Sequence, residues 1–278
     1  MEELHPTIQL SVAASPKIPL DREALRDVID LTLWTGQLLL QHGADTDRIE
    51  ETVHRLGTSL GADWLDILIS PNAIIATTIS GEEFRTKIRR VVSIGVNMTI
   101  LTEINELSRR VDAGELDRHA VRLELARIGQ IKSNYNRWVI VLSVGLACAA
   151  LSRLLGGDWI SFGVTFAASS MAMFVRQTLA KQFYNPLLVV ILTAFVAGGI
   201  SGALVRLLLN GQANGAAQTA QAASVLLLVP GVPLINALQD MIKGHLITGI
   251  ARGVTGALVS MAIALGLLLA ISVVGGGV

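Results

Sequence analysis

The sequence predicts a membrane protein in which a mixed α+β domain precedes a bundle of five transmembrane helices. Charge is concentrated in the first half, because residues 1–137 hold 16 of the 22 Lys and Arg and 20 of the 22 Asp and Glu. Five long apolar stretches occupy the second half. Together these observations indicate two environments, water for the first half and lipid for the second, rather than one soluble core.

We divide the chain into three parts on this basis. Residues 1–20 are expected to form a disordered tail, residues 21–135 a cytoplasmic α+β domain, and residues 136–278 the five-helix transmembrane domain. The first twenty residues contain no long apolar run, so we expect no secretory signal peptide and assign targeting to the membrane helices. The single cysteine, Cys148, lies in an apolar run and is interpreted as a small buried hydrophobic residue.

Two amphipathic helices are expected to open the α+β domain. The first begins at Asp21 and ends before Gly43, because glycine commonly follows a helix end. Asp45 is a favourable N-cap for the second helix, whose apolar residues recur every three or four positions. The pattern then changes to short β-rich runs separated by turns. The remaining predicted elements are strands Trp64–Ser70, Ala73–Ser80 and about Phe84–Val92, and helices at about Met98–Val111 and Leu116–Ile128.

Five stretches are long and apolar enough to cross a bilayer, whose hydrocarbon core of about 30 Å needs roughly 20 residues of helix. The fifth stretch carries no charge at all. Small polar and glycine-rich segments separate the stretches. The predicted spans are Trp138 to about Leu155, Trp159–Val175, Leu187 to about Leu209, about Ala222–Leu238, and Val254–Val274.

Basic residues between the spans predict the orientation in the membrane. Cytoplasmic loops carry an excess of Lys and Arg, and the basic residues cluster before the first span and in every second loop after it. We therefore expect the α+β domain in the cytoplasm and the C-terminus in the periplasm of an inner-membrane protein. The residues that carry this prediction are Arg127, Lys132, Arg137, Arg176, Lys181, Lys243 and Arg252.

The fourth predicted span is interrupted by Pro230-Gly231-Val232-Pro233. Proline removes a backbone donor and disrupts the preceding turn, and the freed carbonyl groups must find partners inside the protein or in a wet cavity. Many transporters build binding sites from such broken helices. A proline kink that only shapes packing is the alternative, but Asn236 and Asp240 just downstream favour a site.

Charged residues gather where the fourth span leaves the membrane. Asp240 and His245 are candidates for proton coupling, because acidic groups near the membrane often take that role. Lys243 and Arg252 are interpreted partly as ordinary cytoplasmic positive charge and partly as partners for an anionic substrate. Arg176, at the end of the second span, is either an interfacial anchor or a counter-charge for a substrate carboxylate.

Two other patterns carry less weight. The run Gly57-Thr58-Ser59-Leu60-Gly61 matches the G-x-S-x-G pattern of hydrolases, but that elbow needs a strand before the serine and a helix after it. Here a helix precedes and a strand follows. The histidines show no metal-ligand spacing, so we expect no metal site and no cofactor.

Several residue runs are shared with a known family. The longest contains Pro-Gly-x-Pro-Leu-x-Asn, and the shared positions extend over nearly the whole chain from about Ala24. On these runs the chain resembles the threonine/serine exporter family of bacterial inner-membrane proteins, and within it the large subunit of two-component succinate exporters. The runs are Leu39–Asp45, Ser70–Ile74, Asn97-Met98, Ala172–Gln177 and Ala223–Ala237, followed by Asp240, Lys243–His245, Gly249 and Arg252.

This resemblance implies a cytoplasmic domain with five spans and export of small amino acids or dicarboxylates driven by the proton gradient. Single-chain members carry a second five-span half. The present chain stops at Val278 and so resembles the split form, which works with a separate small membrane subunit of about four to five transmembrane helices. The resemblance supplies no established set of site residues.

We therefore predict a subunit of a secondary exporter of small carboxylate metabolites, and not an enzyme. The predicted site lies at the break, where Arg176, Lys243 and Arg252 offset substrate charge. The other predicted site residues are Pro230, Gly231 and Asn236 for binding and Asp240 and His245 for the proton. Two alternatives are kept: a regulatory or sensory membrane subunit that gates a partner transporter, and a membrane hydrolase that uses Ser59.

Overall fold

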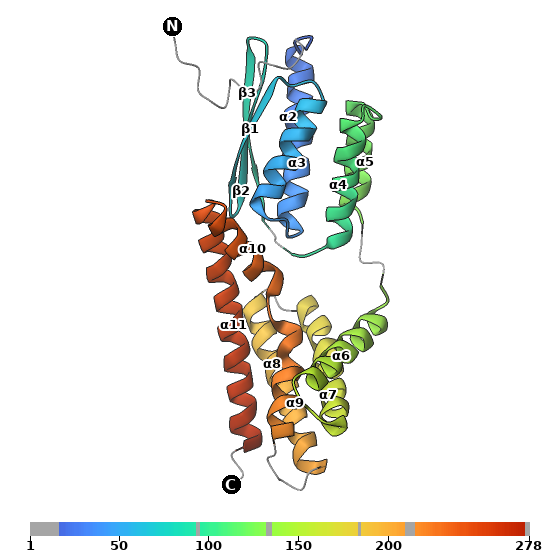
Figure 1. Ribbon diagram of the computed structural model, residues 1–278, viewed down its shortest axis with the longest axis vertical. Coiled ribbons are helices and arrows are strands. Elements are labelled where there is room, and N and C mark those ends of the chain that lie inside the picture. Colours follow the sequence, from blue (N-terminus) through green and yellow to red (C-terminus); the bar gives the residue numbers. More distant parts are fainter. Residues whose placement is uncertain (1–16, 93–94, 132–134, 183–184, 209–214, 276–278) are drawn as a thin grey trace. The chain divides into compact units, whose positions relative to one another are not determined.

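The computed structural model describes residues 17–92, 95–131, 135–182, 185–208 and 215–275 (Figure 1). Most of the predicted tail, residues 1–16, lies outside this described part. The remaining four tail residues lie against the first domain. The Lys17 Nζ donates to the carbonyl oxygens of Thr58 at 2.7 Å and Ala62 at 2.9 Å, and the Leu20 amide donates to Ser80 Oγ at 2.9 Å.

The chain divides into two compact units, and each is described by itself. The first comprises the described residues of Met1–Lys132 together with Val232–Gly253, and the second those of Ser133–Gly231 and Val254–Val278. The segment that follows the Pro230 break therefore groups with the α+β domain, although the sequence analysis placed it in the transmembrane part. Its polar contacts, described below, explain this grouping.

A three-stranded antiparallel sheet forms the centre of the first unit. Its strands are β1 (Trp64–Ser70), β2 (Ala73–Ser80) and β3 (Glu83–Arg90), in the order β1-β2-β3. Helices α2 (Arg22–Gln41) and α3 (Thr46–Ser59) pack on one face of the sheet, and α4 (Met98–Asp112) and α5 (Arg118–Gly129) pack against those helices in turn (Figure 1). The predicted order of helices and strands is confirmed.

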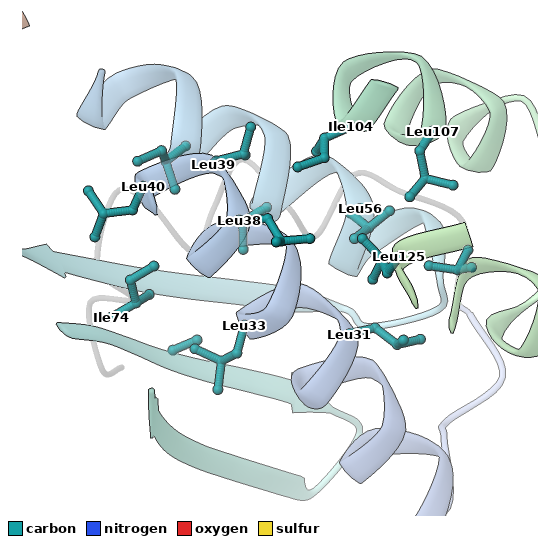
Figure 2. Packing of buried hydrophobic residues seen from close by; sticks show 14 of the residues in the cluster. Leu31, Leu33, Leu38, Leu39, Leu40, Leu56, Ile74, Ile104, Leu107 and Leu125 are labelled. Atoms are coloured by element: carbon teal, nitrogen blue, oxygen red, sulfur yellow. The ribbon is translucent and has the colours of Figure 1, made fainter. Parts of the chain in front are cut away.

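Leucine and isoleucine side chains from all three layers meet in the core of this unit (Figure 2). Leu31 and Leu39 from α2, Leu56 from α3 and Ile74 from β2 are at most 1% exposed. Full burial of such a side chain contributes about 1.5–3 kcal/mol relative to leaving it in water. Residues Ile104 of α4 and Leu125 of α5, both 0% exposed, extend the same core to the third layer.

Side-chain caps fix where the helices of the first unit begin. Asp21 accepts from the Ala24 amide at 2.7 Å, and Asp45 accepts from the Arg48 amide at 3.2 Å. Such caps satisfy amide groups that have no partner within the helix, and each stabilises by roughly 1 kcal/mol. The predicted N-cap at Asp45 is confirmed. Gly43 precedes it with φ +92°, a backbone conformation that favours glycine.

The remaining elements are helical. Among the described residues, four helices are long and apolar enough to span a membrane: α6 (Arg137–Leu154), α7 (Trp159–Gln182), α8 (Pro186–Leu208) and the Leu246–Val274 part of α11 (Leu246–Gly275), whose first turns group with the first unit. The pair Gln218–Leu228 and Gly231–Ile242 qualifies together as one broken span. It contains α9 (Gly215–Val225), the 3₁₀ turn η1 (Leu226–Leu228) and α10 (Gly231–Ile242). If this pair is one span, the described helices offer up to five spans by length and composition, and the broken one corresponds to the fourth predicted span.

Glycines allow the helices of the second unit to approach closely. A Cβ atom added to Gly198 of α8 would lie 2.8 Å from a side-chain carbon of Leu267 and 3.0 Å from the Cβ of Ala270, both on α11. A Cβ at Gly145 of α6 would overlap the hydroxyl of Ser170 on α7. Small residues at helix contacts are typical of proteins in lipid, where close packing drives helix association.

Candidate functional site

The break in the fourth predicted span lies at Val229 and Pro230. The 3₁₀ turn ends at Leu228, and α10 begins at Gly231, whose amide bonds to the Val229 carbonyl oxygen at 2.9 Å. Pro233 falls in the first turn of α10, where a missing amide proton costs nothing because that turn has no partner for it. The two prolines thus end one helix and start another, as the sequence predicts.

Asp240, in the last turns of α10, is the centre of a buried polar cluster in the first unit. Its side chain is 0% exposed. One carboxylate oxygen accepts a hydrogen bond from the Thr46 amide at 2.9 Å, and the other lies 2.9 Å from Nη1 of Arg252 in α11. Removing one partner of a buried ion pair costs about 3–5 kcal/mol, because the other charge is left uncompensated.

The carboxylate of Asp240 also binds a helix end. Thr46 is the first residue of α3, and the amide groups at a helix N-terminus carry partial positive charge. Asp45 caps the same helix from within its own chain segment, whereas Asp240 reaches it from a position 194 residues further on. The negative charge of Asp240 is therefore stabilised twice, by Arg252 and by the start of α3.

Two further bonds attach the segment before α3 to α10 and α11. The Asn236 amide nitrogen donates to the Gly43 carbonyl oxygen at 2.8 Å, and Nη2 of Arg252 donates to the Ala44 carbonyl oxygen at 2.9 Å. Residues 43–46, which we call the α2–α3 link, thus present their backbone polar groups to Asn236, Asp240 and Arg252. The link holds these three side chains together.

The cluster is not fully satisfied. The Thr46 hydroxyl is buried and has no hydrogen-bond partner among the residues that the structure describes, and the facing atoms of Asp240 and Arg252 meet at ion-pair distance without hydrogen-bond alignment. Buried polar atoms of this kind are rare in folded proteins and call for an explanation.

Lys243 and His245 lie at the margin of the cluster. The Lys243 ammonium lies 2.8 Å from Asp47 and 3.7 Å from Asp45, and the hydrogen bond to Asp47 is the main cause of its raised pKa. His245 Nδ1 lies 3.7 Å from the Glu50 carboxylate. Burial raises the pKa of Glu50, and His245 partly opposes this rise. All three acidic residues belong to α3 or its cap.

Gly249 allows α11 to pack on α10 beside the cluster. A Cβ atom at this position would lie 2.7 Å from Met241 Cγ, 2.9 Å from the Ala237 carbonyl oxygen and 3.0 Å from the Met241 amide nitrogen. Two of these three atoms are backbone atoms that cannot turn aside. A glycine is therefore needed for Arg252, one helical turn further on, to reach Asp240.

Most of the sequence matches a known protein family. A family model described as "Putative threonine/serine exporter" matches residues 30–274. The chain belongs to this family. Among its relatives, the "Probable succinate transporter subunit YjjP" of Klebsiella aerogenes is 40% identical over 255 residues, which cover 92% of this chain and 97% of the relative. The protein of the same name in Escherichia coli is 40% identical over 253 residues, 91% of this chain and 97% of the relative.

A more distant member is the "Threonine/serine exporter" of Corynebacterium glutamicum, which is 24% identical over 259 residues. The match covers 88% of this chain and 52% of that exporter. No solved structure matches the chain. With its apolar helices, this member of the threonine/serine exporter family is a multi-pass membrane protein, and the family resemblance drawn from the sequence is confirmed.

Of the eight residues that the sequence analysis singled out in this exporter-family chain, the first unit brings five together: Asn236, Asp240, Lys243, His245 and Arg252. Each contacts the α2–α3 link, the N-cap of α3 or the first turns of that helix. Pro230, Gly231 and Arg176 belong to the second unit. Arg176, in α7, is half-buried and has no ion-pair or hydrogen-bond partner among the described residues.

The partners of this cluster have no recognisable pattern in the sequence. Gly43, Ala44 and Thr46 contribute mainly backbone groups, which leave no chemical signature in a sequence. The signal available was indirect, because Leu39–Asp45 is one of the runs shared with the exporter family. Ser59, the alternative hydrolase candidate, ends α3 and donates to Asp112 Oδ1 at 2.7 Å. It therefore does not occupy a strand-to-helix elbow.

Proposed function

We propose that the chain is a subunit of an inner-membrane secondary exporter of small carboxylate metabolites, coupled to the proton gradient. Family membership supports export. Two relatives at 40% identity carry succinate in their names, whereas the relative named for threonine and serine is 24% identical. This difference favours a succinate-like dicarboxylate as the substrate over threonine or serine.

A separate small membrane subunit, with about four to five transmembrane helices, completes the proposed exporter. The word "subunit" in the name of the relatives supports a partner. The match covers 97% of those relatives and 52% of the Corynebacterium exporter. The α+β domain is placed in the cytoplasm and the C-terminus in the periplasm on the distribution of basic residues.

The buried Asp240 carboxylate is the observation that carries the proposed coupling. When Asp240 is ionised, it attracts Arg252 and the N-terminus of α3. Protonation removes the charge, so the ion pair with Arg252 and the charge-assisted bond from Thr46 both weaken. Of the three side chains that bond to the backbone of the α2–α3 link, Asn236 and Arg252 then keep their bonds to Gly43 and Ala44. Proton binding at Asp240 thus loosens the link, and His245 beside Glu50 is the proposed relay to water.

Cationic side chains are the proposed counter-charges for the substrate. Arg176 is the strongest of them, because no described residue neutralises its guanidinium. Arg252 becomes available when Asp240 is protonated, whereas Lys243 is engaged by Asp45 and Asp47. The helix break at Pro230 and Gly231 is the proposed position of the binding site, because many transporters build such sites from broken helices.

One observation favours a second candidate function, a regulatory subunit that gates a partner transporter. Asn236, Asp240 and Arg252 bond to the α2–α3 link of the α+β domain. Such contacts would equally allow a metabolite bound by that domain to control the membrane helices.

Efflux from proteoliposomes tests the proposal and separates the two candidates. Vesicles loaded with labelled succinate, threonine or serine would hold this chain with its small partner, or either protein alone, with and without an imposed pH gradient. Gradient-driven efflux of one substrate only with both chains supports the exporter and names its cargo. Efflux from the partner alone supports the regulatory subunit.

A further inference from the structure

The sheet of the first unit has an apolar outer face. Helices α2 and α3 cover the inner face, and no helix of the described first unit packs on the other (Figure 1). The strand register aligns two apolar rows across it. One row is Trp64, Ile79 and Phe84, and the other is Leu68, Ile75 and Ile88. Leu68, Phe84 and Ile88 are 64%, 70% and 68% exposed.

This face differs from that of an antiparallel sheet with one side in water, which alternates apolar inward and polar outward residues. Here a polar row lies between the two apolar ones: Asp66, Thr77 and Thr86, of which the two threonine hydroxyls lie 2.8 Å apart. The row Ser70, Ala73 and Arg90 ends the face. An apolar sheet face resembles one half of a β-sandwich, in which a second sheet packs about 10 Å away.

Association along the β1 edge is obstructed. The Thr248 hydroxyl donates to the Ile69 carbonyl oxygen at 3.2 Å, and His54 Nδ1 lies 2.9 Å from the Leu65 carbonyl oxygen. Both carbonyl groups belong to β1 and are bound by side chains rather than by another strand. Side chains that bind an edge hinder strand addition there, so a partner is not expected to pair with β1.

We propose that this outer face is a homodimer contact, in which the same sheet of a second copy packs face to face. The two-fold axis runs parallel to the strands over β2, so β1 of one copy lies over β3 of the other. A two-fold contact must be self-complementary, and this one is. Trp64 meets Phe84 of the second copy, Leu68 meets Ile88, and Ile75 and Ile79 meet their own counterparts.

The positions of the charged residues favour this axis over a two-fold axis that also lies between the two sheets but runs perpendicular to the strands. With the axis parallel to the strands, Asp66 faces the Thr86 hydroxyl, and Arg90 faces Ser70 at the end of the sheet, so no like charges meet. An axis perpendicular to the strands through the polar row would place Asp66 over Asp66 of the second copy. Like charges that face each other across a contact are unfavourable.

The size of the face predicts where the dimer forms. Three strands about 4.8 Å apart and seven or eight residues long present roughly 350 Å², below the roughly 800 Å² per partner of a stable soluble interface. Confinement of both copies in one membrane raises their effective concentration. The contact is therefore expected in membranes rather than in dilute detergent.

Cysteine cross-linking of the full-length chain in proteoliposomes tests the contact. In a Cys148→Ala background, Thr77→Cys places a thiol on the proposed axis, and Glu106→Cys on α4 places a matched exposed thiol on the far side of the domain. With a short bismaleimide, Thr77→Cys is expected to give at least fivefold more covalent dimer than Glu106→Cys. Equal yields would overturn the proposal.

Two further variants test the geometry. Adding Phe84→Asp and Ile88→Asp to Thr77→Cys should reduce the cross-link to the Glu106→Cys level, and both side chains are exposed in the single chain, so its fold is retained. Asp66→Cys mixed with Thr86→Cys should cross-link better than Asp66→Cys alone. A Thr77→Cys product that survives the two aspartates, or that contains the small partner subunit instead of a second copy, contradicts the contact.

Discussion

The carboxylate of Asp240 and the guanidinium of Arg252 lie 2.9 Å apart, with Asp240 closed off from solvent and Arg252 only 11% exposed. The pair joins the last turns of α10 to α11, on either side of the turn at Gly244. Through Thr46 and Ala44 the same two side chains hold the α2–α3 link. One ion pair thus connects the helix after the Pro230 break to the start of α3 in the α+β domain.

Removal of Arg252 is expected to destabilise the protein strongly. Arg252→Ala leaves the Asp240 charge buried without a counter-charge, which costs about 3–5 kcal/mol. Thermal unfolding in detergent should show a clear fall in melting temperature. Asp240→Ala combined with Arg252→Ala should recover part of the loss, because neither charge then remains.

Lys243→Ala is the control for this variant. Lys243 also binds acidic residues of the first unit, but its side chain is 42% exposed, and exposed pairs contribute little to stability. A fall in melting temperature as large as that of Arg252→Ala would show that burial is not what makes the Asp240–Arg252 pair important.

Gly249→Ala is expected to separate α10 from α11. The added Cβ would meet the backbone at Ala237 and Met241 within 3.0 Å, and such overpacking costs roughly 1–3 kcal/mol. Gly253→Ala lies one turn further along α11, and its Cβ would find its nearest atom at 3.8 Å. Melting temperatures should therefore fall for Gly249→Ala and stay near the parent value for Gly253→Ala.

Glu50→Gln is expected to change the pH dependence of stability. Burial raises the pKa of Glu50 above its ordinary value of 4.5, so the folded protein binds a proton more readily than the unfolded chain. The contribution of Glu50 to the free energy of unfolding is therefore fully present below the pKa of the unfolded chain. It is lost as the pH rises through the pKa of the folded protein. Glu50→Gln should accordingly gain stability relative to the parent at pH 7, and this gain should disappear near pH 4. Melting curves across this range measure the difference, and a pH-independent difference would contradict it.

Arg176 is expected to affect transport rather than stability. Its guanidinium contacts no described partner that its removal would orphan, so Arg176→Ala should unfold near the parent temperature. If it offsets substrate charge, the variant should lose gradient-driven efflux of succinate, and Arg176→Lys should restore part of it. If Arg176→Ala exports succinate at the parent rate, Arg176 does not offset the substrate charge.

The sequence predicted the helices and strands of the α+β domain well, because amphipathic periods and caps are local properties. Asp45, for example, is the N-cap that its position indicates. The fifth apolar stretch was placed from Val254, but α11 begins at Leu246. Arg252 lowers the apparent hydropathy of that part of the helix, and only the structure shows that its charge pairs with Asp240 and that its Nη2 donates to the Ala44 carbonyl oxygen.

The partners of the candidate site could not be predicted in the same way. Asn236 and Asp240 were selected because polar groups after a helix break in a membrane span point to function. Their bonds go to Gly43 and Thr46, nearly two hundred residues earlier. Periodicity and spacing describe neighbours along the chain, and backbone acceptors such as Gly43 carry no residue-type signal, so this contact required the fold.

Succinate efflux driven by an imposed pH gradient, compared between the parent and Asp240→Asn, tests the central claim most directly. Both would be reconstituted with the small partner subunit at equal protein content. Asparagine has nearly the same shape and can still accept from the Thr46 amide, but it cannot exchange a proton. The account predicts that Asp240→Asn stays in the membrane and loses the acceleration by the gradient. Gradient-driven efflux at the parent rate would contradict it.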